Sequence, residues 1–322
     1  MGVFTYSLDA PMPAACRGGV LTIGNFDGVH LGHQALLAEA VRQARAHGTM
    51  SVAVTFDPHP SQILRPDRTG PFLSTLQDRI GLLQQHGIDH VLILQTTPAL
   101  LQLDARAFFD RIIIGQFGAK ALVEGFNFGF GHNREGTIEL LQTWCAEKSV
   151  PLTLLPPREV LGQPVSSSRV RSELLLGNVG VVTQLLGLPY RIAGIVGAGA
   201  KRGATLGFPT ANLHEIATLV PGNGVYAVRT TIPPLAPGGR GVRGEGDVTW
   251  PGAANVGPNP TFGENARKVE VHLIGYSGQL YDQLLKVDFV EKIRDTKAFG
   301  SAQELVAQIQ NDIETTKSVL DV

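Results

Sequence analysis

The sequence predicts an α/β domain with a doubly wound parallel sheet, followed by a small antiparallel β-barrel with a terminal helix. Its 322 residues allow two domains of ordinary size. In the first half, short apolar runs alternate with stretches whose apolar residues recur at helical spacing, which is typical of βαβ units. In the second half, Gly- and Pro-rich turns separate short strand-like runs, which favours a barrel. The pattern changes between residues 178 and 189, so we predict domains at 1–186 and 187–322.

The first half opens with an apolar strand at residues 20–23 and a helix directly after it. The apolar residues of that helix are Leu36, Leu37, Ala40, Val41 and Ala44. Further strands are expected at 52–56, 90–94, 121–124 and 152–155, separated by helices near 75–86, 104–115 and 136–147. Ligands of such a sheet bind at the carboxyl ends of its strands, so we expect a site at that edge.

The second half contains strand-like runs, a Gly- and Pro-rich segment and a final helix. The strands are expected at 192–196, 225–230, 268–274 and 284–289. Residues 233–252 are expected to form an exposed loop. The last stretch has Leu305, Val306, Ile309 and Ile313 at helical spacing, so we expect one amphipathic helix packed on the barrel.

The composition describes a globular, nearly neutral protein. Hydrophobic residues make up 43% and charged residues 17%, with a net charge of -1, so nucleic acid is not an expected partner. The apolar runs fall far short of the roughly 20 residues that span a bilayer, and the start of the chain lacks an export signal. Cys16 and Cys145 have no metal-type spacing and are expected to be inert thiols. These observations predict a cytoplasmic protein that does not bind membranes.

The first candidate site follows the strand at 20–23. Two histidines, His30 and His33, stand at i and i+3 where the next helix begins, so they share one helical face. Exposed backbone N–H groups at such a turn favour anions, and imidazoles could donate hydrogen bonds to charge on an attacked phosphorus. Metal ligation and a plain pair of surface histidines are the alternatives. The nucleotide-binding candidates in this segment are Gly24, Asn25, Phe26 and Gly32.

Three further motifs should project at the same edge of the sheet. Residues 56–60, 125–131 and 166–171 each follow a predicted strand, and they are polar or rich in glycine. Taken singly, each could be a turn, an aromatic core segment or a helix cap, and a serine run before a helix is commonly a cap. Four such motifs at strand carboxyl ends are the arrangement that a nucleotide site requires.

The second candidate site begins in the Gly-rich run from Gly194 to Gly207. Such a loop lets the backbone approach phosphates without obstruction by side chains, and Gly199 and Gly207 are its nucleotide-binding candidates. Thr210 and Asn212 alternate in an extended segment, so both face one side, and their hard oxygen ligands suit Mg²⁺. A Gly-rich hairpin with satisfied polar turns is the alternative.

A glutamate on a predicted barrel strand supplies a possible base. Lys268, Glu270 and His272 alternate along the strand at 268–274 and should share one face. The carboxylate of Glu270 could accept the proton of an attacking alcohol. It could equally form a solvated surface pair with Lys268, which is the commoner fate of a strand glutamate.

Residues 15–186 resemble the adenylyltransferase module of bacterial bifunctional riboflavin kinase/FAD synthetases, in the nucleotidyltransferase superfamily with the His-x-Gly-His signature. All four motifs occur in the family's order. The resemblance implies that ATP lies against residues 24–26, His30 and His33, and that residues 167–171 contact its phosphates. The remaining implied phosphate contacts are Ser167, Ser168 and Arg169, and the implied flavin contacts are Asn127 and Phe128. Asp27 and Asp57 are implied contacts of Mg²⁺ or of the flavin, Asp57 on the flavin side.

This resemblance also implies the reaction. The FMN phosphate attacks the α-phosphorus of ATP and releases pyrophosphate. Such a reaction needs no protein nucleophile, because positioning and charge stabilisation supply the catalysis.

Residues 187–316 resemble the riboflavin kinase domain of the same bifunctional enzymes. The blocks that match in order are 206–213, 224–226, 255–263, 269–272 and 289–294. The resemblance implies that Thr210 and Asn212 bind Mg²⁺ and nucleotide. It further implies that Glu270 takes the proton of the riboflavin 5′-hydroxyl as that oxygen attacks the γ-phosphorus of ATP. Arg294 and the segment after it would close over the flavin.

The sequence thus predicts an enzyme that converts riboflavin to FMN and FMN to FAD, with ATP and Mg²⁺ used by each domain. One alternative is a riboflavin kinase whose adenylyltransferase half is weak or altered. The other is a non-catalytic regulator that binds flavin or nucleotide. Formation of FAD and pyrophosphate from FMN and ATP discriminates among them. The sequence does not define an oligomeric state.

Overall fold

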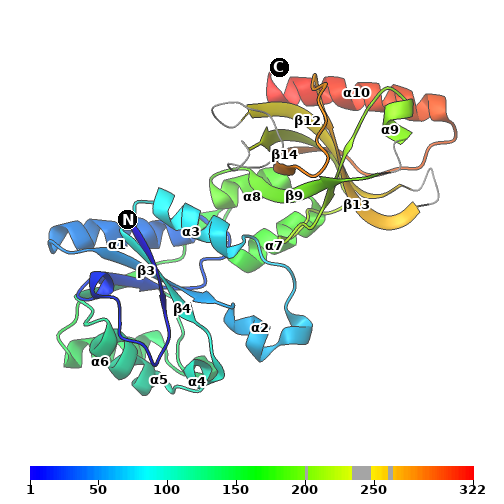
Figure 1. Cartoon of the computed structure of the whole chain (residues 1–322). Helices are drawn as coiled ribbons and strands as arrows, with labels where there is room; N and C mark the ends of the chain where they lie inside the picture. Colours follow the sequence, from blue (N-terminus) through cyan, green and yellow to red (C-terminus); the bar gives the residue numbers. More distant parts are fainter. Residues whose placement is uncertain (200–201, 234–247, 260–263) are drawn as a thin grey trace. The chain divides into compact units, whose positions relative to one another are not determined.

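The computed structural model describes residues 1–199, 202–233, 248–259 and 264–322. The chain divides into two compact units (Figure 1). Unit 1 contains Met1–Gly70 and Ser74–Ser167, and unit 2 contains Pro71–Leu73 and Ser168–Val322. Residues 168–186 thus pack with the barrel, whereas we draw the domain boundary at 186/187; that boundary stays a prediction.

Unit 1 is built on a parallel sheet, as predicted. The strands are β1 (Gly2–Tyr6), β2 (Val20–Ile23), β3 (Ser51–Asp57), β4 (His90–Gln95), β5 (Ala121–Gly125) and β6 (Leu152–Leu155). Their order is β1-β4-β3-β2-β5-β6, and all neighbouring pairs are parallel. The sequence interpretation missed β1, because this edge strand alternates between exposed and buried positions and lacks the continuous apolar run of its neighbours.

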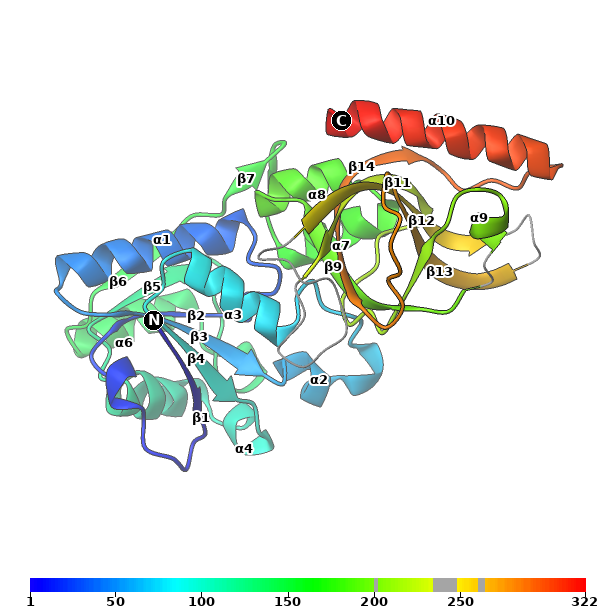
Figure 2. The same cartoon turned by 45° about the horizontal axis from the view of Figure 1, so that its top comes forward.

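Helices cover both faces of this sheet (Figures 1 and 2). Successive residues of β4 enter different cores: Leu92 and Leu94 pack in one, and Val91 and Ile93 in the other. This alternation confirms the doubly wound arrangement. The main helices are α1 (Leu31–Ala46), α3 (Leu76–Gln85), a π-helix (Phe108–Gln116) and α6 (Ile138–Glu147). The shorter elements are α2 (Pro60–Leu64), α4 (Pro98–Leu101), α5 (Ala105–Ala107), β7 (Glu159–Val160), β8 (Gln163–Pro164) and 3₁₀ turns at Ala14–Cys16, Pro66–Arg68 and His132–Arg134.

Unit 2 is a closed antiparallel barrel, as predicted. Its strands are β9 (Tyr190–Gly197), β10 (Ala211–His214), β11 (Gly224–Ile232), β12 (Val248–Asn259), β13 (Glu264–Leu273) and β14 (Leu284–Arg294). The order around the barrel is β10-β13-β12-β11-β14-β9. The expected loop at 233–252 is wrong at its end, because β12 begins at Val248 and carries Pro251 and Gly252 within the strand. Residues 234–247 lie outside the described residues.

Four helices among the described residues accompany the barrel. The predicted terminal helix is α10 (Ala302–Leu320), and it packs along β11, β12 and β14 (Figure 2). Ser301 caps it by accepting the backbone N–H of Glu304. The other three are α7 (Ser167–Leu176), α8 (Val179–Leu186), which packs on β9 and β14, and α9 (Arg202–Thr205).

Candidate active sites

The first site is built on the tight loop at residues 24–30, which joins β2 to α1. Phe26, Gly28 and Val29 have left-handed φ angles of 49°, 77° and 39°. Only glycine adopts such angles without cost, so Phe26 and Val29 store strain in this loop. The fully buried ring of Phe26 anchors the loop in the core. A Cβ on Gly24 would lie 3.4 Å from that ring, which is an ordinary van der Waals contact, so the packing of Phe26 does not itself require a glycine there.

The structure brings His30 and His33 together. His30 is the N-cap of α1, and its Nδ1 accepts the backbone N–H of His33 at 3.3 Å. The two imidazoles stack with their centroids 3.7 Å apart and their planes at 16°, and Phe26 packs edge-on to His33 at 5.2 Å. Gly32 makes this possible, since a Cβ there would lie 3.2 Å from the His30 ring. Because Nδ1 of His30 is an acceptor, its proton lies on Nε2, which is therefore a donor.

Both imidazoles are neutral near pH 7. Burial lowers the pKa of His30 to about 4. Burial also holds the pKa of His33 well below its usual value, and the neighbouring His30 and Arg79 lower it further. A neutral imidazole can still donate one hydrogen bond to a phosphate oxygen. It does so without the free-energy cost of desolvating a buried charge.

Asp27 holds the loop from beneath. Its buried carboxylate accepts hydrogen bonds from the backbone N–H and the hydroxyl of Ser74, each at 3.1 Å. The Ser74 hydroxyl in turn accepts the N–H of Gly28 at 3.0 Å. The hydroxyl of Ser167 donates to the Asp27 carbonyl at 2.9 Å, so the structure brings this predicted phosphate ligand to the loop.

Arg79 of α3 is a residue of this site that sequence reasoning missed. It is 4% exposed, and its Nη1 donates to the carbonyl of Asn25 at 2.9 Å and the hydroxyl of Thr55 at 3.0 Å. A longer bond of 3.3 Å reaches the carbonyl of Phe56. One side chain thus ties the segment that follows β2 to the carboxyl end of β3. No motif surrounds Arg79, so the sequence offers no signal for it.

The guanidinium of Arg79 lacks a carboxylate at ion-pair distance within the described ranges. Burial lowers the pKa of Arg79, and Asp27 and Asp57 offset part of this effect from a longer range. Arginine stays protonated in proteins, so a buried positive charge lies next to His33. Such a charge favours an anion at the loop.

The sheet opens beside this loop. The β2–β5 pairing extends through Leu21 and Leu122, whereas the β2–β3 pairing continues to Ile23. The freed N–H of Ile23 is bonded instead by the buried carboxyl of Glu124, at 2.9 Å. The strand order reverses between β2 and β5, and at such a switch point α/β sheets bind ligands. Burial raises the pKa of Glu124 well above its usual range.

The other predicted residues of the first reaction lie on separate segments. Asp57 ends β3 and is exposed, and Asn127 and Phe128 follow β5. The Phe128 ring stacks on Phe130 at 5.4 Å and packs against the core. This packing agrees with the alternative interpretation of residues 125–131 as an aromatic core segment. Ser168 and Arg169 lie in the first turn of α7, in unit 2. Their contacts with ATP stay predictions.

The second site is a row of residues across neighbouring barrel strands. Asn212 of β10 lies directly opposite Glu270 of β13, and Glu270 lies opposite Asn255 of β12. Directly opposed residues point to the same face of a sheet, so the three side chains are neighbours. Thr210 stands two residues before Asn212, just ahead of β10. The structure therefore brings Thr210, Asn212 and Glu270 into one region. Asn255 joins them although it was predicted only as part of a block.

The glycines near this row have steric roles. A Cβ on Gly199 would overlap the Asn212 amide, so a glycine at this position lets Asn212 pack against the backbone. Gly207 has a φ of 89°, which favours glycine. His272 follows Glu270 by two residues on β13, and sequence reasoning assigned it no contact. Its Nδ1 lies 2.8 Å from the carbonyl of Pro209.

The oxygen atoms of the side chains in this row fit Mg²⁺ as ligands. A hydroxyl, an amide oxygen and a nearby carboxylate are the hard oxygen ligands that Mg²⁺ prefers. Mg²⁺ commonly takes only one or two protein ligands and completes its shell with water and substrate phosphates. In the part of the chain that the structure describes, no cluster of three or more His, Cys, Asp or Glu side chains is placed to hold a metal.

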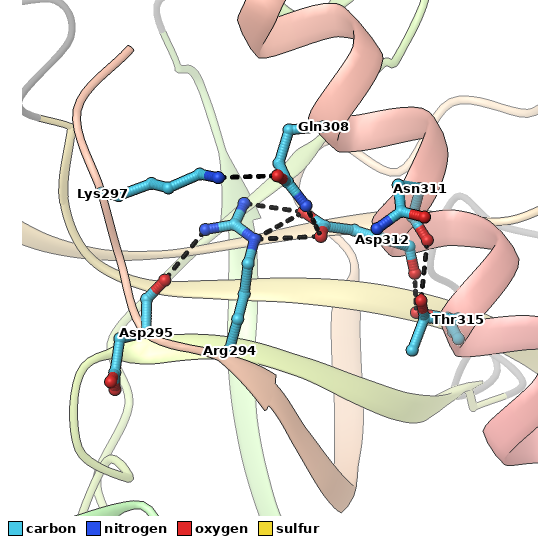
Figure 3. Close-up of polar contacts among 8 residues, drawn as sticks. Arg294, Asp295, Lys297, Gln308, Asn311, Asp312 and Thr315 are labelled. Carbon is cyan, nitrogen blue, oxygen red and sulfur yellow. Dashed lines mark hydrogen bonds and ion pairs between the residues drawn. The ribbon is translucent and has the colours of Figure 1, made fainter.

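Arg294, predicted to contact the flavin, ends β14 and is already engaged with α10. Its guanidinium forms a two-pronged ion pair with Asp312, which is 3% exposed (Figure 3). The flavin contact stays a prediction. Both cysteines are free and buried, and burial raises the pKa of each thiol to about 11, which matches the expected inert thiols.

Comparison with known proteins places each half in a family. A family model described as FAD synthetase matches residues 12–169, and one described as riboflavin kinase matches residues 186–320. A protein of Pseudomonas fluorescens named bifunctional riboflavin kinase/FMN adenylyltransferase is 36% identical over 304 residues, covering 94% of this chain and 93% of the relative. A relative of the same name from Escherichia coli K12 is 35% identical, and the match covers 94% of this chain and 92% of the relative. Another from Bacillus subtilis is 34% identical, and the match covers 91% of this chain and 90% of the relative.

A solved structure gives the same picture of the fold. It comes from Streptococcus pneumoniae, is described as a macrolide-efflux protein, and is 30% identical with a TM-score of 0.83, covering 97% of this chain and 98% of its own. Among the described residues, no helix combines the length and apolarity needed to cross a membrane. With both family models matched in order and the curated relatives aligned along nearly their whole lengths, the chain belongs to the family of bifunctional riboflavin kinases/FMN adenylyltransferases.

Proposed function

We propose that the chain makes FAD from riboflavin in two ATP-dependent steps and that each step uses the residues of one candidate site. The barrel site phosphorylates riboflavin to FMN. The loop site then transfers an adenylyl group from ATP to FMN and releases pyrophosphate. We place both reactions in the cytoplasm, with riboflavin, FMN and ATP as substrates.

In the kinase step, Glu270 is the general base. Its carboxylate takes the proton of the riboflavin 5′-hydroxyl while that oxygen attacks the γ-phosphorus of ATP, and the bond from the γ-phosphorus to the bridging oxygen breaks to release ADP. Thr210 and Asn212 would hold Mg²⁺, which, when bound, neutralises charge on the ATP phosphates. Gly199 and Gly207 let the backbone approach those phosphates. The observation that supports this assignment most strongly is the cross-strand pairing of Asn212 with Glu270.

In the adenylyl transfer, the protein supplies positioning and charge stabilisation. The FMN phosphate oxygen attacks the α-phosphorus of ATP, and the bond to pyrophosphate breaks. His30 and His33 donate hydrogen bonds to the oxygens on which charge develops, and the N–H groups of the loop at 24–30 orient the triphosphate. Ser167, Ser168 and Arg169 contact the phosphates. Asp57, Asn127 and Phe128 lie on the flavin side.

The stacked, neutral histidine pair at the switch point supports this second assignment. A protein that only binds nucleotide has no need of buried donors held in one orientation, whereas a transferase benefits from donors that are fixed before charge develops. This argument disfavours the non-catalytic regulator.

A time course of products from riboflavin, ATP and Mg²⁺ tests the proposal. We expect FMN to appear first and FAD with pyrophosphate to follow. FMN without FAD would support the alternative of a kinase with a weak or altered adenylyltransferase half. Tight binding of flavin or ATP without either product would refute the proposal and support a regulator.

A further inference from the structure

The candidate base and Arg294 belong to one row of the barrel. Glu270 lies opposite Asn255, Asn255 lies opposite Val225 of β11, and Val225 lies opposite Arg294 of β14. Together with Asn212, this row crosses five neighbouring strands. Opposed residues share a face, so Arg294 ends the same face on which Glu270 stands. The helix α10 covers β11, β12 and β14 at that end of the row.

At this end of the row, α10 binds two of the three guanidinium nitrogens of Arg294. Nε donates to both carboxylate oxygens of Asp312 at 2.9 and 3.1 Å, and Nη2 donates to one of them at 2.7 Å (Figure 3). Nη1 donates to the carbonyl of Asp295 at 2.9 Å. Every nitrogen of the Arg294 guanidinium thus has a partner in the protein. A ligand that drew the guanidinium away from this position would break these existing bonds.

The same contact extends along the segment after β14. Nζ of Lys297 donates to Gln308 at 2.7 Å, and the Gln308 amide donates to Asp312 at 2.8 Å (Figure 3). The ring of Phe299 lies 5.8 Å from the Arg294 guanidinium and 5.1 Å from the Lys297 ammonium, within cation–π range. Three residues of the segment 294–299 are therefore fixed, directly or through one neighbour, to α10.

A second Arg–Asp pair on the barrel shows what is unusual here. Arg191 of β9 and Asp288 of β14 form an equally short two-pronged pair at 2.7 Å. Their side chains are 47% and 16% exposed, whereas those of Arg294 and Asp312 are 20% and 5% exposed. An exposed pair contributes little and breaks easily, but a buried carboxylate strongly requires its partner. The buried pair therefore holds the end of β14 in one position.

We propose that Arg294 and Asp312 are positioning residues that lock the segment 294–299 to α10 and thereby set the riboflavin side of the kinase site. Arg294 then acts through Asp312 and is not itself a ligand of the flavin. This inference rests on the proposed kinase function of the barrel and refines the contact expected for Arg294.

Kinetics of full-length variants test the inference. Asp312→Asn keeps the shape of the side chain and leaves the guanidinium present, so a direct flavin ligand would survive it. We expect Asp312→Asn and Arg294→Met each to raise the riboflavin KM on the order of 10- to 100-fold, with the ATP KM and FAD formation from FMN unchanged, since misplacing a contact segment by about 1 Å has effects of this size. The double variant should show no further rise, because the two residues act as one unit.

Asp288→Asn is the matched control, since it breaks the exposed pair on the same strand and should leave both KM values unchanged. If Arg294→Met raises the riboflavin KM while Asp312→Asn does not, Arg294 is a direct ligand and the inference is overturned. Equal loss of turnover for all substrates with a lowered melting temperature would also overturn it, by showing a purely structural role.

Two further measurements keep the outcome clear. If Asp312→Asn does not fold, Gln308→Ala decides instead: it removes one bond to Asp312 and the acceptor of Lys297, and it should raise the riboflavin KM by a smaller factor. An unchanged KM would reject the inference. FMN formation by the unaltered chain is measured alongside, so failure of the kinase assignment itself is seen separately.

Discussion

The buried histidine pair predicts a strong pH dependence of stability in unit 1. We consider the substitution His30→Gln. Glutamine can still accept the N–H of His33 at the start of α1, but it cannot titrate. Burial lowers the pKa of His30 to about 4, whereas the ordinary value is 6.5. The unfolded chain therefore takes up this proton more readily than the folded chain does.

The sign and size of the effect follow from these two values. The part of the free energy of unfolding that depends on neutral His30 is fully present above pH 6.5, and it is lost as the pH falls toward about 4. The whole difference corresponds to roughly 3 kcal/mol, and on the order of 2 kcal/mol of it is lost between pH 7 and pH 5. The His30→Gln variant does not lose this part of its free energy of unfolding, because glutamine does not titrate. Acidification from pH 7 to pH 5 should thus destabilise the unaltered protein by about 2 kcal/mol more than the variant.

Urea unfolding at pH 7 and pH 5 measures this difference. The chain has two tryptophans, so a Trp250→Phe background leaves Trp144, which packs against a core of unit 1, as the fluorescent reporter. His47→Gln is the control, because His47 is exposed at the other end of α1. The reasoning is refuted if acidification changes the His30→Gln variant as much as the unaltered protein, or if the His47 variant shows the same difference.

Two further predictions concern buried groups around the same loop. Arg79→Gln removes the donor that joins the Asn25 and Phe56 carbonyls, so FAD formation from FMN should fall while FMN formation from riboflavin is retained. Parallel assays of the two reactions check this prediction. Equal loss of both activities would contradict it. Glu124→Gln should raise the urea midpoint of unit 1 at pH 8. The pKa of Glu124 is raised above its ordinary 4.5, so its stabilising contribution is present below that value and declines as the pH rises, whereas glutamine stays neutral. A lower midpoint would contradict this prediction.

The sequence predicts elements whose local pattern agrees with their tertiary place. The inner strands of the parallel sheet are buried on both faces, so they appear as continuous apolar runs such as residues 91–94. The loop at 24–30 is recognisable because glycines and histidines stand between a strand and a helix. The segment at 248–252 was misjudged, because proline and glycine usually end strands; here Pro251 sits in β12 opposite Arg229.

Contacts made only by the tertiary fold escaped prediction. Arg79 appears as an ordinary polar residue of an amphipathic helix, and its acceptors at residues 25, 55 and 56 come from two other segments. For Asp312, by contrast, the sequence does contain a signal. It falls seven residues after Leu305 and three after Ile309, so a carboxylate stands on the apolar face of α10. A charge at such a position requires a partner, and the structure supplies Arg294.

The most direct test of two separate sites is a comparison of Glu270→Ala with His33→Ala, each supplied with riboflavin or with FMN. We predict that Glu270→Ala lowers FMN formation by about 10²–10⁴-fold and still converts FMN to FAD, since a positioned general base has effects of this size. His33→Ala should form FMN from riboflavin normally and lose FAD formation. If either variant, still folded, loses both activities equally, the two reactions share one site and the account is wrong.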